Sequence, residues 1–172
     1  MLSNIKFIVV IFSMWSCLYG HTPEKESAGK MLYEKAESAT DDVLAFEFYV
    51  QSGEKGCAKG YEDAIGMMLR GEVEQVSYTI EFLAKQAMQL DAPSLQNDEI
   101  PLGWTTTKEV LLSRFPLNKD DLAFLEKYEK FQVVQHFLGQ IAEKNGQYEE
   151  ALKAYRQAGS FAIADLTALG QR

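Results

Sequence analysis

The fold is decided by the stretch LGQIAEKNGQYEEALKAYRQAG, which runs from Leu138 to Gly159. Asn145-Gly146, a dipeptide typical of tight turns, divides this stretch into two segments whose apolar residues have helical spacing. Small residues seven positions apart, with a large aromatic residue between them, let two helices cross closely while one ring fills the space. We therefore expect two short helices that fold back on each other. The positions that carry this pattern are Leu138, Gly139, Ala142, Ala151, Tyr155 and Ala158.

A looser form of the same pattern occurs twice earlier in the chain. The small residues that close the two earlier copies are Ser52 and Ala87. Ser52 and Ala87 are one period of about 35 residues apart, and Ala158 follows Ala87 by two such periods, a length typical of helical repeat proteins. In the first copy a tyrosine stands where the small glycine would be expected. The first copy consists of Tyr33, Ala45, Tyr49 and Ser52, and the second of Ile65, Gly66, Ile80, Ala84 and Ala87.

These residues resemble the tetratricopeptide repeat and the related Sel1-like repeat. The resemblance covers residues 24–170 and is sharpest at 138–159. It implies an all-α fold, a short α-solenoid of antiparallel helix pairs. The tail SFAIADLTALG (160–170) is expected to form a C-terminal capping helix over the last pair, as terminal repeats do in solenoids.

Helix-start and helix-stop signals give the expected boundaries. An irregular loop is expected at about 91–105, because this segment contains two prolines and has no helical period. The spacing of Thr106 and Glu109 matches a capping box, and Pro116 stops the short helix that follows. The expected helices are 24–38, a second one capped by Thr40-Asp41-Asp42, 58–70, 73–90, 106–115, and one long apolar-periodic run over 122–142 capped by Asn118 to Asp121.

The N-terminus has the layout of a secretory signal peptide. Lys6 precedes the apolar run FIVVIFSMWSCLYG, and a polar segment begins at His21. We therefore expect a signal peptide at 1–20, one helical-repeat domain at 21–172, and export to the periplasm or the cell exterior. Two alternatives place the protein at a membrane: the apolar run is retained as an anchor, or Cys17 is lipidated.

The charge of the chain limits its partners. The formal net charge is −8, and loss of Lys6 with the signal peptide makes it more negative. Such a surface repels nucleic acid and anionic membranes, and it favours basic partners. After cleavage only Cys57 remains, so no internal disulfide forms. This thiol is expected to be a small buried residue, with pairing to another chain as the alternative.

No catalytic, cofactor or metal motif is present. The chain has two histidines, His21 and His136, which is too few for a histidine cluster that binds zinc. Paired acids stand at predicted helix starts, where carboxylates stabilise the helix dipole. We therefore expect a protein that is not an enzyme and needs no cofactor. The alternative is a cell-envelope hydrolase that uses one carboxylate pair among Asp41/Asp42, Asp120/Asp121 and Glu149/Glu150.

In the families resembled, the first helix of each pair lines a concave groove that holds a protein or peptide partner. The resemblance thus implies a non-catalytic exported scaffold, one specific form being a periplasmic immunity or inhibitor protein. The alternative for the groove positions is a solvated helix face. Trp104 is either an anchor of its loop or a further partner contact. The implied groove residues are His136, Gln140 and Glu143 in the last pair, Asp63, Met67 and Arg70 in the middle pair, and Lys30, Glu34 and Glu37 in the first.

Overall fold

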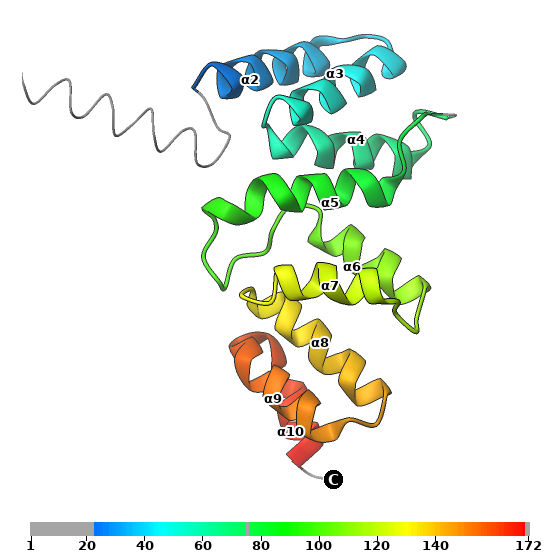
Figure 1. Cartoon of the computed structure of the whole chain (residues 1–172). Helices are drawn as coiled ribbons and strands as arrows, with labels where there is room; N and C mark the ends of the chain where they lie inside the picture. The colour runs from blue at the N-terminus through cyan, green and yellow to red at the C-terminus, as the bar shows by residue number, and fades with distance from the viewer. Residues whose placement is uncertain (1–22, 75, 171–172) are drawn as a thin grey trace, which may run out of the picture. The chain divides into compact units, whose positions relative to one another are not determined.

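The structure is a computed structural model that describes residues 23–74 and 76–170 (Figure 1). All regular elements in these residues are helices, without a strand among them, which confirms the all-α class. The predicted signal peptide at 1–20, with Lys6 and Cys17, lies outside the described residues. Within the described residues, helices that could cross a membrane, by length and apolar character, are absent.

The chain divides into two compact units, each described here by itself. Unit 1 comprises the residues up to Leu90, and unit 2 those from Asp91 onward. The single repeat domain at 21–172 stays a prediction. The helices of unit 1 are α2 (Pro23–Ser38), α3 (Asp42–Glu54), α4 (Ala58–Arg70) and α5 (Ile80–Asp91), the last of which ends at the boundary.

In unit 1, α2 packs against α3, and α3 packs against α4. The carboxylate of Asp41 accepts a hydrogen bond from the Leu44 amide at 2.8 Å, so Asp41 is the N-cap that starts α3. Gly71 ends α4 in the left-handed conformation with φ 71°. The expected helix at 73–90 is wrong in its first turns. It begins at Ile80, because the Thr79 hydroxyl accepts the Phe82 amide at 3.1 Å and caps the helix there.

Unit 2 contains the stretch that decided the fold. Its elements are η1 (Ala92–Ser94), α6 (Trp104–Ser113), α7 (Lys119–Lys127), α8 (Gln132–Lys144), α9 (Tyr148–Ala158), η2 (Gly159–Ala162) and α10 (Ile163–Gly170). Asn118 caps α7 through a full capping box with Asp121. By contrast, the expected capping role of Thr106 is wrong, because α6 already starts at Trp104 after Gly103.

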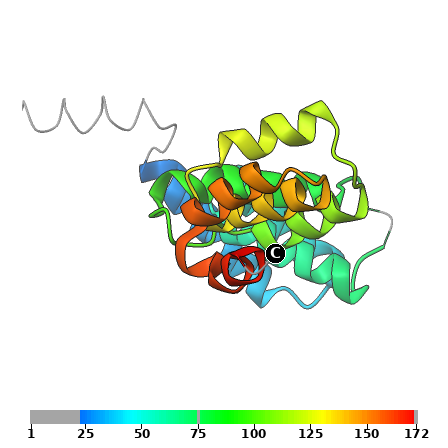
Figure 2. The same ribbon diagram turned by 90° about the horizontal axis from the view of Figure 1, so that it is seen from below.

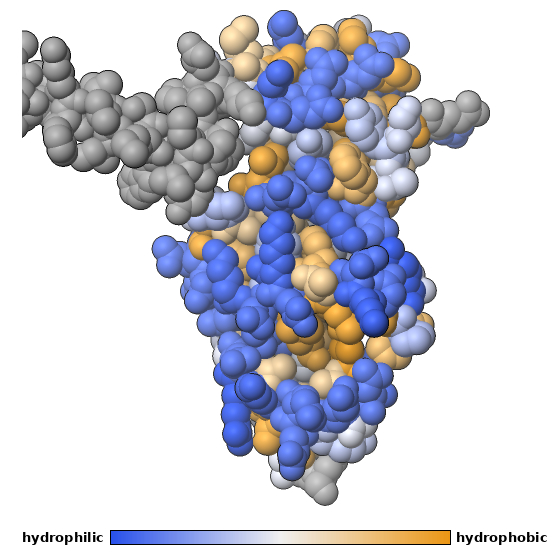
Figure 3. All heavy atoms as spheres, viewed as in Figure 1, coloured by the Kyte–Doolittle hydropathy of each residue, from blue (hydrophilic) through white to orange (hydrophobic). Residues whose placement is uncertain are grey.

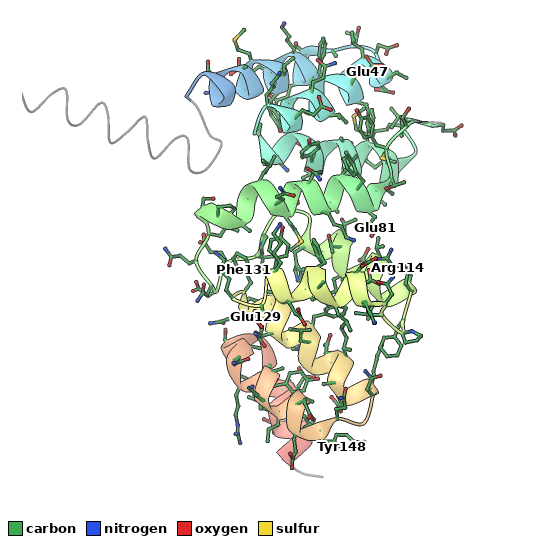
Figure 4. The ribbon with its side chains drawn as sticks, in the orientation of Figure 1. Glu47, Glu81, Arg114, Glu129, Phe131 and Tyr148 are labelled. Atoms are coloured by element: carbon green, nitrogen blue, oxygen red, sulfur yellow. The ribbon has the colours of Figure 1, made fainter. Side chains whose placement is uncertain are left out.

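The single run expected over 122–142 is also wrong, since it breaks into α7 and α8. The break follows Tyr128, and Phe131, labelled in Figure 4, is fully buried at the start of α8. The Gln132 amide, which has no partner inside α8, donates to the Asn97 carbonyl at 2.8 Å. The Lys130 ammonium donates to the Ala92 carbonyl at 3.1 Å. The residues at the break are therefore hydrogen-bonded to the segment that precedes α6. This is a tertiary contact, and the local sequence gives no signal for it.

Helices α8 and α9 form the predicted antiparallel pair. A Cβ atom added to Gly139 would come within 2.4 Å of the Tyr155 ring, so the ring lies directly against the backbone of α8. Tyr155, Ala151 and Ala158 are fully buried. The turn between the helices contains Gly146 with φ 74°. The close crossing predicted from the small residues is thus present in unit 2.

The corresponding positions of unit 1 pack differently. Tyr33 occupies the place of the small glycine, and its ring meets that of Tyr49 edge-on, with 5.3 Å between the centroids. Tyr49 consequently stays half-buried. At Gly66, an added Cβ atom would meet only the guanidinium end of Arg70. The close crossing expected at Gly66 is therefore wrong.

The tail forms a closing helix as expected, although α10 begins only at Ile163 and the residues before it belong to η2. Helix α10 is in contact with α9 (Figure 1), and Figure 2 shows the same end of the chain from below. Phe161, Leu166 and Leu169 pack against the core made by Tyr155 and its small neighbours. This helix therefore covers one end of the α8–α9 pair.

Candidate functional site

Unit 2 contains an open cleft of about 620 Å³. Side chains from α6, α8, α9 and α10 surround it, so four elements position the site. We call this surface the cleft. Its lining residues are Lys108, Leu112, Phe137, Gln140, Ile141, Glu143, Lys144, Tyr155 and Asp165.

The apolar part of the cleft consists of Phe137 and Ile141 of α8 and Leu112 of α6. Phe137 is held from behind by Trp104, whose ring meets it edge-on at 5.7 Å between centroids. Trp104 is only 4% exposed. It therefore anchors the start of α6, which is one of the two roles expected for this residue, and a partner contact here stays a prediction.

The acidic side chains of the cleft have hydrogen-bond partners within unit 2. The Tyr155 hydroxyl donates to Glu143 Oε2 at 3.0 Å, and burial together with this carboxylate raises the pKa of Tyr155. Asp165 Oδ2 lies 2.8 Å from His136 Nε2, which ties α10 to α8. These contacts hold the acidic side of the cleft in place.

The basic side chains of the cleft lie over aromatic rings. The Lys108 ammonium is 5.9 Å from the centroid of Phe137, and the Lys144 ammonium is 5.4 Å from that of Phe115. Such cation–π contacts orient an ammonium group without using up its hydrogen-bond donors. The cleft therefore combines an apolar base, an internally bonded acidic side and two oriented lysines.

The structure brings the three groove residues expected on α8 to this one place. Gln140 and Glu143 line the cleft, and His136 adjoins it through Asp165. The sequence reasoning missed Lys108, Lys144 and Asp165. Lys144 immediately follows a predicted groove residue and was within reach of sequence reasoning. Lys108 and Asp165 come from other helices, and helical spacing alone gives no signal for them.

The groove residues expected in unit 1 do not form a comparable site. Met67 is only 5% exposed and packs in the core of unit 1, and its expected partner contact stays a prediction. Asp63 accepts the Tyr33 hydroxyl at 2.5 Å and pairs with Lys59 at 3.0 Å. Arg70 is exposed and pairs with Glu72. Lys30, Glu34 and Glu37 are exposed on α2.

Figure 3 shows polar side chains over most of the visible face of unit 2, with an apolar patch over α7 and α8. Within the part of the chain that the structure describes, groups of three or more His, Cys, Asp or Glu placed to hold a metal ion are absent. No known family, curated protein or solved structure matches this chain. The candidate site therefore rests on its own geometry.

Proposed function

We propose that the protein is a non-catalytic, exported helical-repeat scaffold of the tetratricopeptide-like or Sel1-like kind. It binds a protein or peptide partner in the cleft of unit 2. The observation that carries this proposal is the position of Gln140 and Glu143. The repeat resemblance places both residues in a partner groove, and both line an open cleft of about 620 Å³.

The fold of the surrounding helices supports the proposal. The close crossing of Gly139 and Tyr155 is the packing that the repeat pattern requires, and α10 covers the pair as a terminal cap does. A solenoid presents its partner surface on the first helix of a pair, which here is α8. A periplasmic immunity or inhibitor protein is one specific form of such a scaffold, because it needs a binding surface and no reactive groups.

The acid pairs support a scaffold more than a hydrolase. Asp121 is buried, pairs with Arg114 at 2.6 Å and completes the capping box of α7. Asp41 caps α3. Glu149 and Glu150 are exposed in the first turn of α9. Each pair thus contributes to a helix start, where a carboxylate stabilises the structure.

The proposal is tested by photo-crosslinking in the producing cell. A photoreactive residue replaces Gln140 in one variant and Lys153, which is exposed on α9, in a matched control. We expect a defined cross-linked partner from position 140 that position 153 does not give. Identical products from both positions, or a product from position 153 alone, would show that the cleft is not the binding surface.

A further inference from the structure

The lysines of the cleft differ from its acids in their partners. Glu143 and Asp165 are held by hydrogen bonds within unit 2. Neither Lys108 nor Lys144 forms an ion pair with any residue that the structure describes. Each ammonium group carries three hydrogen-bond donors that a ring face does not satisfy. The groups of the cleft that remain able to pair with a ligand are therefore these two ammonium groups.

These two lysines come from different helices and line one cleft. Lys108 lies on α6 and Lys144 at the end of α8, and each is positioned over an aromatic ring. Ammonium groups that are oriented before binding lose less side-chain entropy when they pair with an anion. A carboxylate is the anion that a protein segment supplies through Asp or Glu.

The base of the same cleft is apolar. Phe137 and Ile141 are buried beneath it, and Leu112 is 37% exposed beside them. A large apolar side chain of a ligand would cover Leu112 and gain roughly 25 cal/mol for each Å² of apolar surface removed from water. The ligand thus has two requirements that lie close together, one apolar and one anionic.

We propose that the cleft binds an extended peptide segment in which an Asp or Glu side chain lies close to a large apolar side chain. Carboxylates of the segment pair with Lys108 and with Lys144, and the large apolar side chain packs on Leu112, which follows Lys108 by about one helical turn on α6. This inference rests on the proposed function and specifies its ligand. Because the whole chain carries a net charge of −8, long-range attraction does not favour such a segment. Specificity depends on the two lysines.

The test uses a random peptide library displayed at the N-terminus of a carrier, so that the peptides have no free terminal carboxylate. We expect the selected peptides to carry an acid near a large apolar residue. Replacing that acid with its amide should weaken binding about tenfold to a hundredfold, the loss of a charge-assisted hydrogen bond. Lys108→Gln and Lys144→Gln should each weaken binding to a similar extent. The matched control Lys153→Gln removes the same charge from α9 and should leave the affinity unchanged.

The outcomes separate the two proposals. Peptides that lose binding when Gln140→Trp fills the cleft, but that carry no acid, would overturn this inference and leave the proposed function standing. Peptides that bind only after a free terminal carboxylate is restored would have the same consequence. Equal losses of affinity in Lys144→Gln and Lys153→Gln would also overturn this inference alone. A selection without any peptide that is sensitive to Gln140→Trp would contradict the proposed function itself.

Discussion

Gly139→Ala is the smallest change that tests the close crossing of α8 and α9. The added methyl carbon would lie 2.4 Å from Cδ1 and Cε1 of Tyr155. That ring is fully buried, and its hydroxyl is bonded to Glu143, so it has little room to move. Overpacking of this kind costs about 1–3 kcal/mol. The better helix propensity of alanine offsets about 1 kcal/mol of this cost.

Gly66→Ala on α4 is the matched control. There the new methyl group would meet only the flexible end of Arg70, at 3.0 Å. This variant should therefore gain the propensity term without the clash and melt slightly above the wild type. The difference between the two variants isolates the clash, which we expect to be about 1–3 kcal/mol. Each kcal/mol corresponds to about 2–4 °C in the melting midpoint of a chain of this size.

Far-UV circular dichroism follows the helices of both units during thermal unfolding. Trp104 fluorescence follows unit 2 alone once residues 1–20 are removed, because Trp104 is then the only tryptophan. The reasoning is refuted if Gly139→Ala is stabilised as much as Gly66→Ala. In that case the Tyr155 ring does not lie against the backbone at residue 139, and the repeat packing of α8 and α9 is absent.

Three further predictions concern other parts of the chain. Asp121→Ala should lower the free energy of unfolding by about 1–3 kcal/mol in urea, because it leaves Arg114 without this carboxylate, whereas exposed Asp120→Ala should change it little. Burial raises the pKa of Tyr61 from 10.0 to about 12, so stability is fully present below pH 10 and falls as the pH rises toward 12. Tyr61→Phe should reduce this alkaline loss, and an unchanged loss would exclude Tyr61 as a source. Intact-mass measurement of exported protein should show a chain that begins near His21, and a retained Met1 would contradict cleavage.

The α8–α9 pair was predictable because its information is local. The turn dipeptide, the small residues and Tyr155 lie within one short stretch and specify one another. Gly66 shows the limit of this reasoning. It follows a branched apolar residue as Gly139 does, yet the atoms nearest to an added Cβ belong to the Arg70 guanidinium and not to a ring. A glycine permits a close crossing without requiring one.

The break between α7 and α8 was hidden for a related reason. The apolar period continues through it, and only the bonds from Gln132 and Lys130 to the preceding loop reveal why the helix stops. The candidate site follows the same rule. Its α8 residues follow from helical spacing, whereas Lys108 and Asp165 reach the cleft through tertiary packing.

The central claim is that the cleft of unit 2 binds the partner, and one comparison of affinities tests it most directly. A partner recovered by cross-linking from position 140 is titrated against Glu143→Lys, Gln140→Ala and Lys153→Glu, each checked for normal melting. Glu143→Lys reverses a charge inside the cleft and removes the carboxylate that accepts the Tyr155 hydroxyl. Gln140→Ala removes a side chain that lines the cleft. We predict that Gln140→Ala binds more weakly and that Glu143→Lys changes the affinity, while Lys153→Glu, at an exposed position of α9, binds as the wild type does. Equal affinities for all three variants would contradict the claim and place the binding surface elsewhere.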